Sequence, residues 1–125
     1  MKLQIPTTDG LNVITGYGTG YVAINGVRRA HSVIITPVGD AMPWAATDVA
    51  SLTIDDLAPR LAHGAAVILL GSGETLRFPP AAVRRHFGDA RLLVEIMDSR
   101  AAARTFNVLV AEGRHVACGL IVGQP

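Results

Sequence analysis

The chain contains a single cysteine and a single lysine, few aromatic residues, and no long apolar run. Cys118 has no partner for an internal disulfide, which fits a reducing compartment. No apolar run approaches the roughly 18 residues of a membrane-spanning helix, so we expect no membrane span. The net charge of +1 offers no basic face, so we expect no nucleic-acid partner. The first ten residues hold no apolar signal core, so we expect a cytoplasmic protein.

What remains is an apolar, glycine-containing chain of the size of one domain. It has 125 residues, of which 50% are hydrophobic and 13 are glycine. A chain of this length buries roughly two-thirds of its surface on folding, which is enough for a real core. We therefore expect a single domain over residues 1–125.

The first third of the chain has the pattern of β-strands. Asn25–Gly26 supplies the positive φ angles of a tight hairpin turn, and it separates Tyr21–Ile24 from the longer segment Val27–Ile35. We predict one hairpin arm over each of these segments. Before them we predict a strand over Leu11–Ile14.

A glycine-rich stretch, Gly16–Gly20, lies between these strands. A phosphate-binding loop leads from a strand into a helix, whereas this stretch leads into another strand. We interpret it as a bend or bulge, with phosphate binding as the alternative.

The rest of the chain alternates between apolar runs and helical patterns. Continuous apolar runs predict strands that are covered on both faces, and glycine, proline and capping residues mark the helices between them. The predicted strands are Ala65–Leu70, Leu92–Met97 and Val116–Val122. The predicted helices run from Thr53 or Ala58 to Gly64, from Pro80 to Phe87, and from Asp98 to Gly113. This order predicts an α/β fold with an N-terminal β-hairpin unit.

Two strand ends form the candidate site. One buried strand ends in Gly71, Ser72 and Gly73, and the next ends at Asp98, the expected N-cap of the long helix. If the connection between them is a right-handed crossover, the strands are parallel and their ends meet at one edge of the sheet. Ligands of α/β proteins bind at such an edge. We therefore predict a crevice between these two strand ends.

The long helix adds Arg104 and Asn107 to the candidate site. The other faces of this helix are mostly apolar, so we expect Arg104 to be largely buried. A buried guanidinium needs a partner, which Asp98 or Glu74 could supply. We favour a structural ion pair; a small anionic ligand or a partner's carboxylate is the alternative.

No stretch of the chain carries a recognisable catalytic set. The turn in Leu69–Glu74 lacks the third glycine of a dinucleotide loop, and Glu74 places a negative charge where a phosphate would lie. Cys118 lies in an apolar run, which is typical of an inert core thiol. The four histidines lack the spacing of zinc ligands, and Ser72 has no base beside it. We therefore expect no cofactor, no metal and no catalytic residue.

The sequence MDSRAAARTFNVLVAEGR at Met97–Arg114, preceded by LLGSGE and FPP, resembles a small single-domain family. This family includes mitochondrial complex I assembly factor 3, an adipogenesis-associated domain protein and many bacterial relatives of unknown function. The resemblance runs from Val13 to Val122. It implies a three-layer α/β arrangement on a mixed β-sheet. The eukaryotic member is similar to a chaperone-like assembly factor.

Three positions depart from the pattern of that family. Ala103 stands where the family often has cysteine, Phe106 where it has tyrosine, and Arg100 where it has a small residue. A catalytic role for that thiol or phenol could not be carried out by this chain. The departures therefore weigh against an enzyme.

These observations support two hypotheses on function. The first is a non-enzymatic protein-binding domain of assembly-factor type with a protein partner. The alternative is a protein that binds a small anionic ligand, or an enzyme, which uses the crevice at Gly71–Glu74 and Asp98–Asn107. An exposed apolar surface around Trp44 would favour protein binding. A pocket lined by the crevice residues would favour a ligand.

Overall fold

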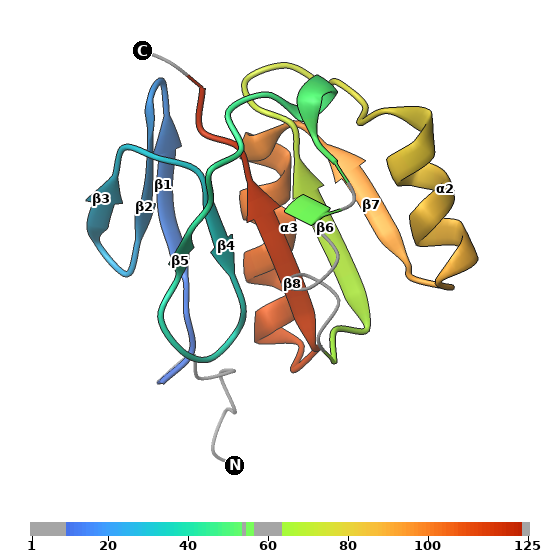
Figure 1. The fold of residues 1–125 in the computed structure, drawn as a ribbon. Helices are drawn as coiled ribbons and strands as arrows, with labels where there is room; N and C mark the ends of the chain where they lie inside the picture. Colours follow the sequence, from blue (N-terminus) through green and yellow to red (C-terminus); the bar gives the residue numbers. More distant parts are fainter. Residues whose placement is uncertain (1–9, 54, 57–63, 124–125) are drawn as a thin grey trace.

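The computed structural model describes residues 10–53, 55–56 and 64–123. Their strands form two sheets (Figure 1). The smaller sheet is antiparallel and has the order β1 (Ile14–Gly18), β2 (Tyr21–Ile24), β3 (Val27–Arg29). The larger sheet is mixed and has the order β5 (Met42–Pro43), β4 (Val33–Ile35), β8 (Val116–Leu120), β6 (Val67–Gly71), β7 (Val94–Met97). Within it β8, β6 and β7 are parallel.

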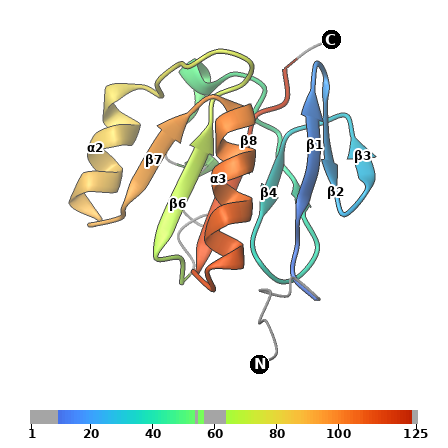
Figure 2. The same cartoon turned by 180° about the vertical axis from the view of Figure 1, so that it is seen from behind.

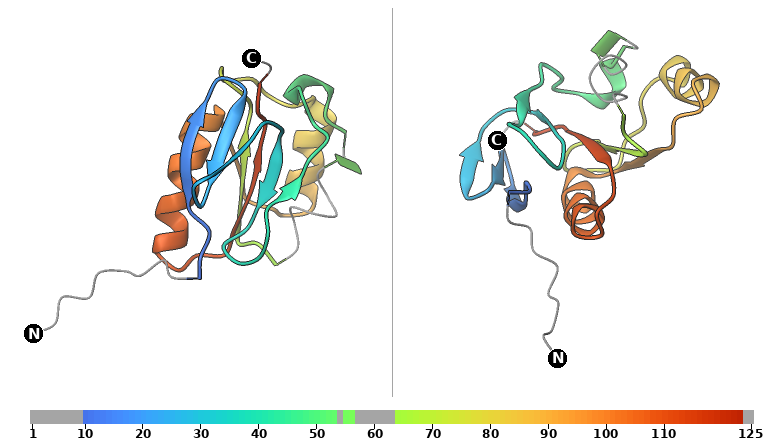
Figure 3. Two further views of the ribbon diagram at one scale, coloured as in Figure 1. Left: turned by 90° about the vertical axis from the view of Figure 1, so that its left-hand side faces the viewer. Right: turned by 90° about the horizontal axis from the view of Figure 1, so that it is seen from below.

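The helices cover both faces of the larger sheet. Helix α3 (Ser99–Ala111) packs on one face together with β1 and β2, and α2 (Ala81–Asp89) packs on the other with the short 3₁₀ helix η1 (Val49–Ser51). Figure 2 shows α3 in front of β6 and β8, and Figure 3 shows α2 and η1 on the opposite side. The described residues thus form the three-layer α/β arrangement on a mixed sheet that the resemblance implied, with the hairpin unit before it.

All three predicted strands of this sheet are present, and burial on both faces is confirmed for two of them. Every residue of β6 and of β8 is buried, because these two strands lie in the middle of the sheet between the helical layers. Strand β7 lies at the edge, with Glu95 exposed and its other residues half-buried, so the prediction that it is covered on both faces is wrong.

The N-terminal β-structure differs from the prediction in two ways. The arm predicted as one strand over Val27–Ile35 is two strands in different sheets, β3 and β4. The chain changes sheets at Ser32, whose buried hydroxyl accepts a hydrogen bond from the Val122 amide at 2.9 Å. The strand predicted over Leu11–Ile14 instead begins at Ile14 and continues through the glycine-rich stretch, with a register shift between Ile14 and Gly16. The bend or bulge interpretation is therefore confirmed only in part, because the irregularity lies at the start of the stretch and the rest forms the end of β1 and the turn into β2. The Asn25–Gly26 turn is confirmed, with φ angles of 51° and 83°.

The predicted helix that ends at Gly64 lies mostly outside the described residues. At its expected start, the Thr53 amide and hydroxyl both donate to the Asp56 carboxylate, at 2.8 and 2.9 Å. This is the contact of a capping box. Helix α3 is capped by Asp98 as predicted, because its carboxylate accepts from the Ala101 amide at 2.9 Å.

The contact between β6 and α3 yields a stability prediction. A Cβ on Gly71 would lie 2.8 Å from the Ser99 hydroxyl oxygen and 2.9 Å from the Ser99 Cα. We expect Gly71→Ala to lower the free energy of unfolding by about 1–3 kcal/mol, because the backbone of α3 must move away. Urea denaturation measures this change.

Gly88 in α2 is the matched control for Gly71. Nothing lies within 4 Å of a Cβ placed there. Because alanine is the better helix former, Gly88→Ala should leave stability unchanged or raise it by up to about 1 kcal/mol. Equal effects of the two substitutions would contradict the close approach at Gly71.

Candidate functional site

The loop after β6 is hydrogen-bonded to the start of α3. The Ser72 amide donates to the Met97 carbonyl at 2.8 Å, and the Ser99 amide donates to the Gly73 carbonyl at 2.8 Å. The fully buried Ser99 hydroxyl accepts from the Gly73 amide at 2.9 Å and donates to the Ile121 carbonyl at 2.7 Å. These bonds place the two predicted strand ends side by side. The bond to Ile121 joins the segment after β8 to the same junction.

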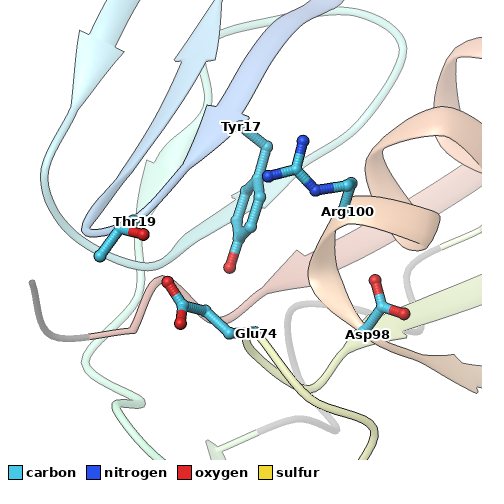
Figure 4. Close-up of a pocket in the computed structure, with 5 residues that line it drawn as sticks. All are labelled: Tyr17, Thr19, Glu74, Asp98 and Arg100. Carbon is cyan, nitrogen blue, oxygen red and sulfur yellow. The ribbon is translucent and has the colours of Figure 1, made fainter.

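A pocket of about 360 Å³ opens above this junction (Figure 4). It is lined by Tyr17, Thr19, Glu74, Asp98 and Arg100. Two of these residues come from the β1–β2 hairpin, one from the loop after β6, and two from the start of α3. The lining holds two carboxylates and one guanidinium, so it carries a net negative charge at neutral pH.

Tyr17 forms the central wall of the pocket. The Arg100 guanidinium lies 5.7 Å from the centre of its ring, and Figure 4 shows the hydroxyl pointing toward the space between Glu74 and Asp98. The hydroxyl donates a long hydrogen bond to the Ile121 carbonyl at 3.5 Å. Burial raises the pKa of the Tyr17 phenol above its ordinary value; the two carboxylates act in the same direction, whereas Ser99 and Arg100 oppose it. The phenol is therefore a neutral hydrogen-bonding group near pH 7.

Ser72 lies in a neighbouring pocket of about 270 Å³ on the other side of Glu74. Its hydroxyl donates to the Thr75 carbonyl at 2.7 Å and accepts from the Arg77 amide at 3.0 Å. Both roles of the hydroxyl are thus occupied within its own turn. Gly73 has a φ of 107°, which favours glycine at that turn. Ser72 and Gly73 shape the site rather than offer groups to a ligand.

Arg104 and Asn107 lie further along α3, away from the two strand ends. Both line a third pocket of about 220 Å³, between β1 and α3. Arg104 is exposed to solvent, so the prediction of a largely buried guanidinium is wrong. The buried residues of α3 form one stripe, and Arg104 lies outside it on a face that the sheets leave open to solvent. No ion pair with Asp98 or Glu74 is needed to compensate a buried charge.

Asn107 has a structural contact that the sequence did not reveal. Its side-chain oxygen accepts from the Ile14 amide at 2.8 Å, and its side-chain nitrogen donates to the Ile14 carbonyl at 2.8 Å. The residues are 93 positions apart. Asn107 therefore joins the edge of the smaller sheet to α3, and it positions the hairpin that carries Tyr17.

Sequence reasoning did not identify Tyr17 or Thr19 as parts of the site, and it included Ser99 and Arg100 only within the range Asp98–Asn107, without a role for either. The available signal in the sequence was a tyrosine, Tyr17, between two glycines, Gly16 and Gly18. No local pattern indicates that this hairpin packs beside the start of α3.

The described residues provide little support for chemistry at a metal or thiol. Among them no group of three or more His, Cys, Asp or Glu side chains could hold a metal ion. Cys118 is fully buried in β8, and burial raises the pKa of its thiol far above its ordinary value. This thiol lies in the core, as the sequence predicted.

Comparison with known proteins identifies relatives over almost the whole chain. The model of a family described as protein of unknown function (DUF498/DUF598) matches residues 14–121. An uncharacterized protein of Rhodobacter capsulatus is 31% identical over 123 residues, which are 97% of this chain and 93% of that protein. A crystal structure from Bordetella parapertussis superposes with a TM-score of 0.84 at 34% identity, covering 90% of this chain and 97% of the other. A solution structure from Bordetella pertussis, described as a Mth938-like domain, has a TM-score of 0.75 at 30% identity, covering 99% of this chain and 94% of the other.

One further relative is named for a membrane. A Francisella tularensis protein named 13 kDa major membrane protein is 35% identical over 74 residues, which are 59% of this chain and 60% of that protein. In the part of this chain that the structure describes, no helix has the length and apolar character needed to cross a membrane.

The Asn107 contact yields a second stability prediction. Asn107→Ala leaves the buried amide and carbonyl of Ile14 without partners, so the free energy of unfolding should fall by about 1–3 kcal/mol. Arg104→Ala, one turn earlier on the same helix, is exposed and should change it by less than about 0.5 kcal/mol. Thermal unfolding of both variants tests this contrast. A larger loss of stability in Arg104→Ala than in Asn107→Ala would instead support the structural ion pair predicted for Arg104.

The raised pKa of Tyr17 predicts a dependence of stability on alkaline pH. In the unfolded chain the phenol ionises near its ordinary pKa of 10.0, whereas in the folded protein it holds its proton to higher pH. The free energy of unfolding should therefore fall as the pH rises above about 10, and below that pH this group adds no pH dependence. Tyr17→Phe should reduce the fall. Urea denaturation at about pH 9 and about pH 10.5 measures the difference, and identical slopes in both proteins would contradict it.

Proposed function

We propose that this chain, which belongs to the DUF498/DUF598 family of proteins of unknown function, binds a small polar ligand that carries a positively charged group. The pocket at the start of α3 is the binding site. The observation that carries the proposal is the convergence of two carboxylates, Glu74 and Asp98, and two hydroxyls, Tyr17 and Thr19, on one pocket (Figure 4). Its volume of about 360 Å³ suits a small molecule.

The charge of the lining favours a cation over the anion that the sequence analysis considered. The N-terminus of a helix attracts anions through its free amides. In α3, however, the Asp98 carboxylate caps the Ala101 amide, and the Ser99 amide is bonded to the Gly73 carbonyl. Glu74 adds a second negative charge. An ammonium group offers several donors, which match the carboxylate and hydroxyl acceptors of this pocket.

We propose binding rather than catalysis at this site. The Ser72 hydroxyl is held in its turn, the Asp98 carboxylate caps α3, and the Cys118 thiol lies in the core. A nucleophile activated by a neighbouring base is the usual signature of covalent catalysis. The pocket lining contains no histidine and no cysteine that could serve in such a pair.

Protein binding of assembly-factor type is the other hypothesis that the resemblance suggested. An exposed apolar surface around Trp44 would have supported it. The Trp44 side chain is only 6% exposed and packs beneath the sheet face with α2, so it forms no such surface. We therefore place ligand binding first and protein binding second.

We also propose that the protein works in the cytoplasm, close to a membrane. The cytoplasm is the location expected from the sequence. The name of the Francisella tularensis relative supports proximity to a membrane.

The proposed function predicts selective binding of small amines. Titration with ethylenediamine, followed by NMR or calorimetry, should give saturable binding that ethylene glycol and succinate do not give. Glu74→Gln and Asp98→Asn should each weaken binding by about tenfold, because each removes one charge-assisted hydrogen bond. Both substitutions keep the shape of the side chain, and asparagine still caps a helix.

Glu112→Gln is the matched control for this experiment. Glu112 is exposed at the opposite end of α3 and lies outside the pocket. It should leave binding unchanged. Binding of succinate in preference to the diamine would contradict the proposal, as would equal losses in all three variants.

A further inference from the structure

The loop between β6 and α2 exposes two large apolar side chains. Leu76 and Phe78 are each 54% exposed, although both sit in a short connection next to the fold's main layers. Figure 1 shows this connection running from the end of β6 over to α2. Neither side chain lines the pocket at the start of α3. The ligand site therefore does not account for them.

The segment that carries these two side chains is rich in arginine and is flanked by Glu74 and Asp89. Residues 75–88 contain three arginines and no aspartate or glutamate. Arg77 lies between the two apolar residues in sequence, is exposed, and also lines the pocket beside Ser72. The Arg84 guanidinium lies 5.8 Å from the centre of the Phe78 ring. Arg85 is exposed on the same helix. We call Leu76, Arg77, Phe78, Arg84 and Arg85 the β6–α2 face.

We propose that the β6–α2 face docks on a membrane surface that contains anionic lipids. Leu76 and Phe78 enter the boundary between headgroups and acyl chains, and the arginines contact the lipid phosphates. An exposed aromatic and aliphatic pair beside clustered arginines is the composition of interfacial anchors. Each basic residue near an anionic leaflet adds to the attraction, which salt screens.

The size of the apolar surface favours a lipid bilayer over a protein partner. A stable protein interface covers about 800 Å² on each side. Two half-exposed side chains supply only a small part of that area, and the residues around them are charged. A membrane needs no complementary pocket, because shallow insertion and charge attraction act together.

The loop is held in a fixed shape, which suits an anchor. The Ser72 hydroxyl bonds both the Thr75 carbonyl and the Arg77 amide, so it ties the base of the loop at both sides of Leu76. Pro79 is buried at the other end. The two apolar side chains are therefore presented before any membrane is met, and little ordering is needed on docking.

Flotation of the purified protein with lipid vesicles tests the proposal. We expect about tenfold more protein to bind vesicles containing about one-third phosphatidylglycerol than vesicles of phosphatidylcholine alone, and the difference should shrink at high salt. The double substitution Leu76→Ser with Phe78→Ser should remove most of the bound protein. Arg77→Gln with Arg84→Gln should do the same for the anionic vesicles.

Matched controls exist for both pairs. Leu93, which precedes β7, and Val108 on α3 are each 55% exposed but lie outside the β6–α2 face, so Leu93→Ser with Val108→Ser should leave binding unchanged. Arg104→Gln with Arg114→Gln removes two exposed charges elsewhere and should reduce binding much less. All four pairs are at exposed positions, and circular dichroism checks that each variant is folded.

Three results would overturn the proposal. The first is equal binding to neutral and anionic vesicles. The second is an equal loss in the Leu76/Phe78 pair and the Leu93/Val108 pair. The third is an absence of vesicle binding. If the Leu76/Phe78 double substitution then abolished binding to another protein, the β6–α2 face would belong to a protein partner.

Discussion

The buried hydroxyl of Ser99 is the contact on which the rest of the site depends. It bonds the Gly73 amide and the Ile121 carbonyl at the same time, and the Ser99 amide bonds the Gly73 carbonyl. Three segments that are far apart in sequence are thereby joined at the start of α3. Gly71 allows this junction, because any side chain there would occupy the space of Ser99. The pocket exists because these segments are held at a fixed separation, not because of any one ligand-facing residue.

The same junction bears on the kind of ligand that we propose for the pocket. In many α/β proteins the free amides at a helix N-terminus accept a phosphate. Here the first amides of α3 are already bonded by Gly73 and by the Asp98 carboxylate. Two of the first three amides of α3, those of Ser99 and Ala101, are thus bonded from within the protein, and the charged side chains of the lining dominate what a ligand meets. Glu74 and Asp98 outnumber Arg100, and this reverses the sign that the strand-end topology alone would suggest.

The sequence predicted the parts of the fold that depend on local burial, and it missed the parts that depend on distant contacts. The central strands β6 and β8 were found because burial on both faces leaves a continuous apolar run. The division of Val27–Ile35 into β3 and β4 depends on Ser32, whose partner Val122 lies 90 residues away. Likewise, the hairpin wall of the pocket is placed by Asn107 and Ile14, which are 93 residues apart. Arg104 was misjudged because helical periodicity shows which side chains share a face, but not how much of that face the sheet covers.

The ligand pocket and the β6–α2 face share one loop, and this places two chemically opposite surfaces within a few residues of each other. The loop begins at Ser72, passes Glu74, whose carboxylate lines the pocket, and continues through Leu76 and Phe78 to α2. The Ser72 hydroxyl bonds the Thr75 carbonyl and the Arg77 amide, so it fixes the turn between Glu74 and Phe78. A turn bonded in this way resists independent motion of its two sides. The acidic pocket is therefore held at a set position relative to the basic face. A molecule docked on a membrane through that face would present the pocket near the lipid headgroups. Positively charged amines are concentrated there by the charge of an anionic surface.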